Sequence, residues 1–212
     1  TDDIRPGLGA SGVANLKRFV QTGGLLITAE DTATFAIDVG MAPGVFITPS
    51  SKLKVVGSVL QAKFVDRRSP IAATYTRDEL ALYSAAGQSF TVSNQITGDK
   101  GLPNAKDFQR PTGRGGPHDT DTPEGRASIK APALPDVKPW QALPLNAEQM
   151  RNNPWAIPVG QRPQVILRYA DAKNLLISGL LDGGDEMAER AAVVDARYGK
   201  GHVLLFASNP IW

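Results

Sequence analysis

Two apolar runs near the carboxyl end of the chain give the clearest secondary-structure signal. Ala191–Arg197 and His202–Ser208 are rich in valine and leucine, and Tyr198–Gly201 joins them with two glycines. Glycine supplies the positive φ that a tight turn requires, so the pattern predicts a β-hairpin. Val203–Ala207 is almost wholly apolar, and we expect it to be a central strand that is covered on both faces.

The amino-terminal part predicts a helix followed by a strand. Within Gly12–Gln21, apolar residues recur at the spacing of one helical face. The pair Gly23-Gly24 ends the helix, and the apolar run Leu25–Ala29 follows as a buried strand. This order is typical of an α/β crossover, so we expect Leu25–Ala29 at the centre of a sheet that contains parallel strands.

The middle of the chain carries weaker signals. We predict short helical segments at 35–40 and 69–72, strands at 55–66, 90–93, 165–170 and 175–181, and a hairpin turn at 171–174. Apolar and polar residues alternate near the end of the segment 55–66, which indicates a half-exposed strand.

Residues 98–163 differ from the rest in composition. They contain 11 of the 16 prolines, and proline removes a backbone donor and restricts the φ and ψ of a regular element. We predict a long irregular excursion with one short helix near 145–151. Trp140 and Trp155 are expected to anchor it by burial, whereas residues 113–125 contain no such anchor and are expected to be its most mobile part.

Composition excludes several classes of protein. The 212 residues carry 23 basic and 21 acidic side chains, a formal net charge of +2, which does not indicate a nucleic-acid partner. No apolar run approaches the roughly 20 residues of a membrane-spanning helix, and the polar opening residues do not resemble a signal peptide. The chain has no cysteine, so it lacks a thiolate nucleophile, a disulfide and a cysteine-ligated zinc.

One glycine motif suggests a nucleotide site. Gly7–Gly12 has the spacing G-x-G-x-x-G, and Glu30-Asp31 follows about twenty residues later, where a dinucleotide site holds the ribose. That fingerprint also requires a strand directly before the first glycine, and residues 1–6 are polar, short and end in proline. We therefore interpret Gly7–Gly12 as a glycine-rich lead into a helix.

Other chemically active residues are few. The densest group of potential metal ligands is His118, Asp119, Asp121 and Glu124. Glycines and prolines surround this group, so we interpret it as a solvated loop rather than a hard-cation site. We likewise interpret His202 as a structural histidine and Arg67-Arg68 as a solvated turn. No motif places a nucleophile beside a base, and we predict no catalytic, cofactor-binding or metal-binding residue in the chain.

Several short motifs occur together in one known setting. They are Gly12–Ala29, Val65-Asp66, Ser69–Ala72, Ser178–Leu181 and Tyr198–Val203. In this order they resemble the C-terminal class I glutamine amidotransferase-like domain of bacterial zinc carboxypeptidase-like proteins of the carboxypeptidase A type. The resemblance implies a flavodoxin-like α/β fold with a mixed sheet, in a single domain over residues 1–212 that the irregular excursion 98–163 interrupts.

The resemblance also has implications for function. It implies export to the periplasm or beyond, a preceding peptidase-like domain as partner, and zinc in that domain alone, because neither histidine here is followed by glutamate three residues later. The amidotransferase nucleophile is a cysteine, which this chain lacks. The implied role is a non-catalytic accessory domain for packing, substrate access or assembly. Such domains continue past a segment like residues 209–212 into a closing helix, so we expect a part of a larger protein.

Two other functions and one other partner remain open from the sequence. A sugar- or peptide-binding module would collect polar groups at the C-terminal ends of the parallel strands. A hydrolase with an unrecognised site would bring a serine or a carboxylate within hydrogen-bond reach of a histidine. The partner could also be a second copy of the chain, in a homo-oligomer.

Overall fold

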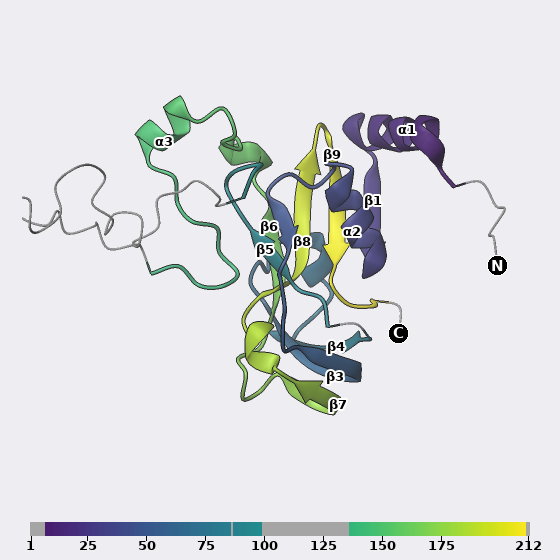
Figure 1. The fold of residues 1–212 in the computed structure, drawn as a ribbon, viewed down its shortest axis with the longest axis vertical. Helices are drawn as coiled ribbons and strands as arrows, with labels where there is room; N and C mark the ends of the chain where they lie inside the picture. Colours follow the sequence, from purple (N-terminus) through teal and green to yellow (C-terminus); the bar gives the residue numbers. More distant parts are fainter. Residues whose placement is uncertain (1–6, 86, 99–135, 211–212) are drawn as a thin grey trace, which may run out of the picture.

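The computed structural model describes residues 7–85, 87–98 and 136–210 (Figure 1). The helices in this part of the chain are α1 (Gly9–Gln21), α2 (Asp31–Asp38) and α3 (Ala147–Asn152), with the 3-10 turns η1 (Pro70–Ala72), η2 (Val159–Gln161) and η3 (Gly184–Glu186). The strands are β1 (Leu25–Ala29), β2 (Val45–Ile47), β3 (Lys54–Phe64), β4 (Glu79–Ser84), β5 (Phe90–Val92), β6 (Gln164–Tyr169), β7 (Leu176–Asp182), β8 (Ala191–Tyr198) and β9 (Gly201–Phe206).

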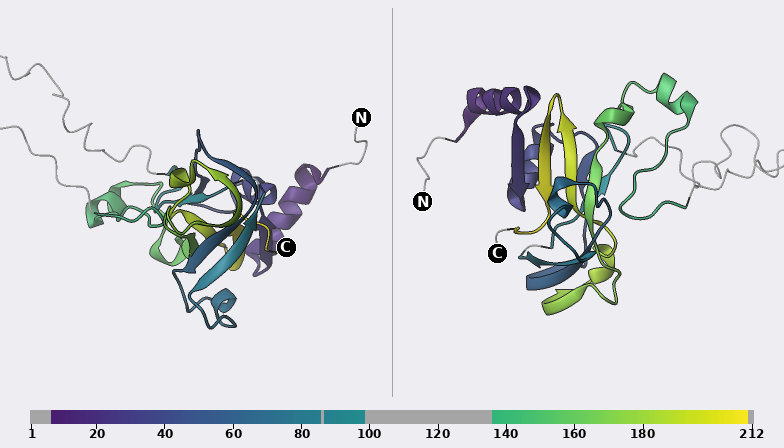
Figure 2. Two further views of the ribbon diagram at one scale, coloured as in Figure 1. Left: turned by 90° about the horizontal axis from the view of Figure 1, so that it is seen from below. Right: turned by 180° about the vertical axis from the view of Figure 1, so that it is seen from behind.

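These strands form one nine-stranded sheet. Its main order is β1-β9-β8-β6-β3-β4, while β5 joins β2 to β8, and β7 pairs with β3. β1 and β9 run parallel, and every other pairing between the described strands is antiparallel. The sheet curves strongly, so that β3, β4 and β7 run across the direction of β1, β8 and β9 in Figure 1, as the two views of Figure 2 also show.

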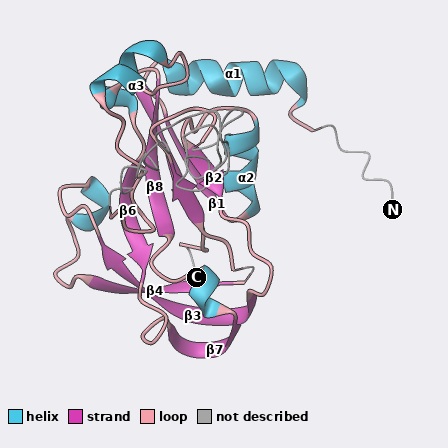
Figure 3. Ribbon diagram, turned by 60° about the vertical axis from the view of Figure 1, so that its left-hand side comes forward, coloured by secondary structure: helices cyan, strands magenta, loops and turns pink. Residues whose placement is uncertain are grey.

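The predicted flavodoxin-like α/β fold is therefore wrong. That fold has a mainly parallel sheet with helices on both faces, whereas seven of the eight pairings between described strands are antiparallel. α2 packs against β1, β2 and β9, and α1 lies across the end of β1 (Figure 3). α3 lies on the other side of β8 and β9 from β1 in Figure 1. The predicted helix and strand at the start of the chain are present, and β1 pairs parallel with β9. No described strand precedes α1, so this pair of elements is not a crossover between neighbouring parallel strands.

The closing hairpin is confirmed, and its position in the sheet differs from the prediction. β8 and β9 pair antiparallel up to Tyr198 and Gly201, and β9 lies between β8 and β1. Residues of β9 alternate between buried and half-buried, so the strand is not fully covered on both faces. β1 pairs only with β9 in the described part of the chain, and its Leu25 and Ile27 are 52% and 57% exposed. β1 is thus an edge strand, not a central one.

The core contains a fully buried tyrosine. Tyr169, at the end of β6, is fully buried, and its hydroxyl donates to the carbonyl oxygen of Gln88 at 3.1 Å. Burial, and to a smaller extent the charge of Glu30, raises the pKa of Tyr169 far above its usual value. The hydroxyl therefore stays neutral, as a hydrogen-bond donor inside an apolar core must.

β6 and β7 do not form the predicted hairpin. Both run antiparallel to β3 along the edge that β4 leaves open, β6 beside its C-terminal end and β7 beside the preceding part. Gln61 lies between them, since its N–H donates to Leu175 at 2.8 Å and its carbonyl accepts from Ala170 at 2.8 Å. Residues 171–174 thus form a turn within one long interrupted strand. In that turn the Asn174 side chain donates to Asp171 and lowers the pKa of its carboxyl group.

The described part of the excursion is attached to the rest of the protein by both backbone and side-chain contacts. α3 confirms the predicted short helix. The guanidinium of Arg168 lies 4.3 Å from the ring centroid of Trp140, a cation–π contact that anchors this residue. Trp155 is 54% exposed and anchors little. Another attachment is Ile157, which is buried and whose N–H donates to the carbonyl oxygen of Asn94 at 2.8 Å.

A single carboxylate joins η3 to the loop before β3. Glu186 accepts hydrogen bonds from the backbone N–H groups of Ser51, Lys52 and Leu53 at 2.8, 3.0 and 3.1 Å, and from the Ser51 hydroxyl at 2.9 Å. These bonds, that from Lys52 first, lower the pKa of Glu186 from 4.5 to about 2. The bonded form of the side chain is therefore the ionised one.

The Glu186 contact predicts a specific acid sensitivity. Between pH 4.5 and about 2 the unfolded chain protonates Glu186 and the folded chain does not, so the free energy of unfolding should fall as the pH falls through this window. In Glu186→Gln, the free energy of unfolding measured with urea should depend less on pH between 2 and 4.5, because glutamine binds no proton when the chain unfolds. Asp185→Asn, at the exposed neighbouring position, is the matched control. An unchanged slope in Glu186→Gln would contradict this assignment.

Close backbone contact at Gly201 predicts a second effect. A Cβ atom there would collide with the carbonyl oxygens of Val20 and Gly24, where the end of α1 meets the start of β9. Gly201→Ala should therefore lower the free energy of unfolding by about 1–3 kcal/mol. Gly160→Ala is the control, since no atom lies within 4 Å of its added Cβ, and it should change stability by no more than about 0.5 kcal/mol. Equal denaturation midpoints for the two variants would disprove the contact.

Candidate functional site

The turn between β1 and α2 contains a strained residue. Glu30 has φ 48° and ψ −123°, a conformation that costs a residue with a side chain about 1–3 kcal/mol. Thr32 holds the turn, because its hydroxyl accepts from the Ala29 N–H at 2.8 Å and donates to the Ala29 carbonyl at 2.6 Å. A sharp strand-to-helix turn of this kind carries the reactive side chain in several classes of enzyme. Its geometry makes Glu30 a candidate functional residue.

The surroundings of Glu30 are polar and partly unsatisfied. Its carboxylate accepts from the backbone N–H of Ala85 at 3.4 Å. Nearby on α2, Thr34 accepts from the side-chain amide of Gln88 at 3.0 Å. The other amide atom of Gln88 and the hydroxyl of Ser208 are buried and have no partner among the described residues. This end of the parallel pair β1 and β9 can therefore accept hydrogen bonds from a polar ligand and donate them to it, but no histidine among the described residues contacts the Glu30 carboxylate.

A second polar site is a cavity of about 390 Å³ beside β6 and β8. It is lined by Asp66, Arg68, Ser69, Pro70, Gln164, Ile166 and Asp195. Asp66 accepts from Arg68, from the backbone N–H at 2.9 Å and from the guanidinium at 3.3 Å. The hydroxyl of Ser69 accepts from Ile71 at 3.4 Å and so caps η1. Two carboxylates against one guanidinium favour a neutral or cationic polar ligand.

His202 extends this polar cavity by one group. Its Nδ1 atom lies 2.9 and 3.0 Å from the two carboxylate oxygens of Asp195. A carboxylate thus lies within hydrogen-bond reach of a histidine, which is one of the two arrangements that we expect of a hydrolase. Such a contact fixes the orientation of an imidazole that acts as a base. Among the described residues, no hydrogen bond joins this pair to a serine or threonine hydroxyl, and the Ser69 hydroxyl instead accepts from Ile71 within its own turn. The geometry by itself is that of a structural cross-strand pair on β8 and β9.

A second cavity, of about 500 Å³, is mainly apolar. It lies between the C-terminal end of α2, η2 and the β8–β9 hairpin, where Ile37, Phe46 and Ile157 form part of its wall. Arg197 and Gln161 are the polar side chains in that lining, together with the hydroxyl of Tyr198. It brings together no charged pair and no strained residue.

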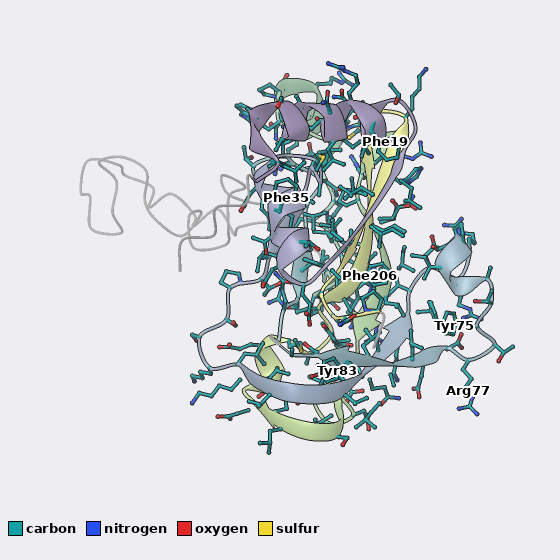
Figure 4. All side chains as sticks on the ribbon, turned by 90° about the vertical axis from the view of Figure 1, so that its right-hand side faces the viewer. Phe19, Phe35, Tyr75, Arg77, Tyr83 and Phe206 are labelled. Carbon is teal, nitrogen blue, oxygen red and sulfur yellow. The ribbon has the colours of Figure 1, made fainter. Side chains whose placement is uncertain are left out.

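Exposed apolar side chains mark two open edges of the sheet. The β1 patch, on α1 and β1 and the segment before them, consists of Leu8 (60% exposed), Phe19 (54%), Leu25 (52%) and Ile27 (57%). The β7 patch, on β3 and β7, consists of Val56 (66%), Leu176 (42%), Ile177 (54%) and Leu180 (69%). Figure 4 faces the first edge and shows Phe19 beneath α1. Single exposed apolar residues are ordinary, but sets of them along edge strands are typical of protein–protein contacts.

The glycine motif does not build a nucleotide site. Gly9–Gly12 lie within the first turns of α1, and the described residues before them form no strand. The Glu30 carboxylate is directed to Ala85. The interpretation as a lead into a helix therefore agrees with the structure, except that the glycines are already helical.

The two adjacent arginines differ from each other. Arg68 is exposed, as predicted for a solvated turn. Arg67 is not free in solvent: its guanidinium donates to the carbonyls of Tyr75 at 2.6 Å and Arg77 at 3.1 Å, and it lies 5.0 Å from the ring centroid of Phe64. Arg67 thus fixes the loop between β3 and β4, a role that the sequence prediction missed.

The predicted metal-ligand group, His118 with Asp119, Asp121 and Glu124, lies outside the described residues, as do residues 113–125 as a whole. Across the residues that are described, no three histidine, aspartate or glutamate side chains gather as metal ligands. No helix among them is long and apolar enough to cross a membrane.

Comparison with known proteins identifies no family. No protein-family model matches the chain, and no curated protein matches it. Three solved structures have partial similarity at low identity. A β-galactosidase from Bacillus circulans sp. alkalophilus matches 94% of this chain and 18% of its own at 8% identity and a TM-score of 0.43. Two cytoplasmic proteins of Salmonella typhimurium match with TM-scores of 0.42 and 0.37, at 9% and 10% identity.

The chain spans only part of these proteins. It matches 54% and 51% of the lengths of the two Salmonella proteins and covers 100% and 94% of itself in doing so. The TM-scores are too low for any of the three to carry an argument about fold or function.

Two functional candidates were missed by the sequence reasoning. The strain at Glu30 depends on a φ value that residue identity does not reveal, although Thr32 two residues later is a typical turn-fixing side chain. The His202–Asp195 pair had a readable signal. Once Tyr198–Gly201 is taken as the turn, the alternation of strand residues places 195 and 202 on the same face of the hairpin.

The strain at Glu30 can be measured with two substitutions. Glu30→Ala and Glu30→Gly both remove the carboxylate, and only glycine also removes the steric cost of positive φ. Glu30→Gly should therefore be the more stable of the two by about 1 kcal/mol, the reverse of the usual order. Urea unfolding of both variants gives the difference. A glycine variant less stable than the alanine variant would show that the turn is not strained.

Proposed function

We propose that this chain is a non-catalytic accessory domain that packs against another protein surface within an exported zinc carboxypeptidase-like protein. The observation that carries the packing role is the exposure of the β1 patch and the β7 patch on open strand edges. Leaving so many large apolar side chains in water is unfavourable by about 25 cal/mol per Å² of apolar surface, and a partner surface would remove this cost. The proposed identity of the parent protein rests on the sequence motifs alone, because the flavodoxin-like fold that the same resemblance implied is not the fold observed.

The chemistry of the described residues supports binding over catalysis. A hydrolase needs a nucleophile within reach of a base. The one histidine–carboxylate contact, His202 with Asp195, belongs to neighbouring strands, and the hydroxyl of Ser69 caps its own turn. In this proposal, zinc is bound by a preceding peptidase-like domain and not by this chain. The whole protein is located in the periplasm or outside the cell.

The polar cavity favours a second candidate function, the binding of a sugar. Asp66, Asp195 and Gln164 offer carboxylate and amide oxygens, which accept hydrogen bonds from the neighbouring hydroxyls of a carbohydrate. Titration of the ¹⁵N-labelled chain with glucose, N-acetylglucosamine and maltose should shift amide signals at these residues, and Asp195→Asn should abolish the shifts. The absence of shifts at millimolar sugar would remove this candidate.

The packing role predicts extra protection in the protein encoded by the complete gene. Amide hydrogen exchange measured on that product and on this chain alone should show slower exchange at β1, at β7 or at both in the product. The hairpin β8–β9, which is paired in the chain already, serves as the internal reference. If both edge strands exchange at the same rate in the two proteins, no packing surface exists there and the proposal fails.

A further inference from the structure

We infer that the β1 edge binds a second copy of this chain, through antiparallel pairing of the two β1 strands about a two-fold axis. The inference rests on the proposed packing function and names the partner for one of its two surfaces. Three independent features of the edge support it: the pattern of free backbone groups, the position of the apolar side chains, and the distribution of charge on the flanking helices.

Among the described residues, the backbone N–H and C=O groups of β1 that have no partner lie at two positions, Leu25 and Ile27. The Gly24 carbonyl accepts from His202 at 3.1 Å and the Glu30 N–H donates to Phe206 at 2.9 Å, so even-numbered residues face β9. In a strand, alternate residues direct their N–H and C=O groups to opposite sides. Leu25, Ile27 and Ala29 therefore face the open edge, and both groups of Ala29 are already bonded to Thr32.

These free groups fit a two-fold axis. In an antiparallel pair, two opposed residues exchange both of their backbone hydrogen bonds. With the axis at Leu26, Leu25 of one copy faces Ile27 of the second copy, and the reverse pair forms by symmetry. The N–H and C=O groups of Leu25 and Ile27, four backbone groups in each strand, then all have partners. Thr32 blocks any longer pairing, and so it fixes this register.

The side chains support the same register. Leu25 and Ile27 lie on one face of the strand, where both are more than half exposed. Pairing about Leu26 places each of them opposite the other residue of the second copy, so two apolar cross-strand pairs form and leave water together. The N-terminal part of α1 reaches beyond the β1 edge in Figure 1, toward the space that the second copy would occupy. Phe19, in the last turn of α1, lies against Gly24 at the start of β1 and adds an exposed apolar ring there.

The charges on the flanking helices are complementary under this symmetry. α1 carries Lys17 and Arg18 and no acidic residue, and α2 carries Asp31 and Asp38 and no basic residue. α1 lies at the N-terminal end of β1 and α2 begins at its C-terminal end. An antiparallel second copy brings its Asp31 to the basic end of α1, and the exchange is mutual. A partner of unrelated charge pattern would gain no such match.

The β7 edge is less suited to the same role. β7 shows two register shifts in its pairing with β3, and Gly179 in its middle has φ 101°. Irregular strands of this kind resist edge-to-edge pairing. β7 therefore provides a matched control, with similar apolar exposure and no expected self-association.

Sedimentation equilibrium of this chain from 1 to 500 µM tests the inference. The wild type should show a monomer–dimer equilibrium, and Ile27→Glu should weaken it at least tenfold. Leu180→Glu, at a residue of the β7 patch that is 69% exposed against 57% for Ile27, should leave the equilibrium unchanged, and far-ultraviolet circular dichroism verifies the fold of both variants. A wild type that stays monomeric throughout, or a dimer that Leu180→Glu disrupts and Ile27→Glu does not, would overturn the inference.

Charge reversal provides a second test that leaves the apolar patch intact. Lys17→Glu and Asp31→Lys should each weaken the dimer several-fold, and the double variant should recover much of the loss because the pair is restored across the axis. Additive losses in the double variant would contradict the two-fold arrangement.

If the chain is monomeric while β1 is protected in the complete gene product, the self-association fails and the packing function stands. Unprotected β1 and β7 in that product contradict the packing function itself.

Discussion

The fold depends on a backbone contact at Gly201, where no side chain can be accommodated. The carbonyl oxygens of Val20 and Gly24 occupy the space of its missing Cβ, so the end of α1, the start of β1 and the turn of the final hairpin meet at one point. This contact brings β1 beside β9 in the single parallel pairing between described strands, although 172 residues separate Gly201 from Ala29. Everything that makes β1 an edge strand with a free apolar face follows from its position outside β9.

The sequence predicted local elements well and their assembly poorly. The helix in Gly12–Gln21, the strand in Leu25–Ala29 and the hairpin around Tyr198–Gly201 were predicted because periodicity and glycine act over a few residues. The arrangement of 165–170 and 175–181 was wrong, because the Asp-Ala-Lys-Asn turn has hairpin chemistry while both strands pair with the distant β3. The same limit applies to the fold class, since a helix followed by a strand at the start of a chain does not determine which strands pair with it or in which direction.

Prediction of the candidate sites followed the same division. His202 was correctly identified as a strand residue, and its contact with Asp195 follows from hairpin register alone. Glu30 and the cavity around Asp66 depend on segments that are brought together from different parts of the chain, and on a backbone torsion angle that composition does not encode. The exposed apolar patch on β1 could also not be predicted from the sequence. The apolar residues at 25 and 27 are typical of core positions, and only the place of β1 at the sheet edge shows that they are exposed.

The interrupted strand formed by β6 and β7 has a consequence for how this chain tolerates change. Gln61 bonds to both Ala170 and Leu175, so the register on each side of the break is fixed independently of the residues between them. Lengthening the turn 171–174 would add chain at the surface and would shift neither strand, at an entropic cost that grows only slowly with loop length. Evolution and protein engineering thus have a permissive insertion point in the middle of the sheet, where a new loop can be displayed between the two halves of a strand.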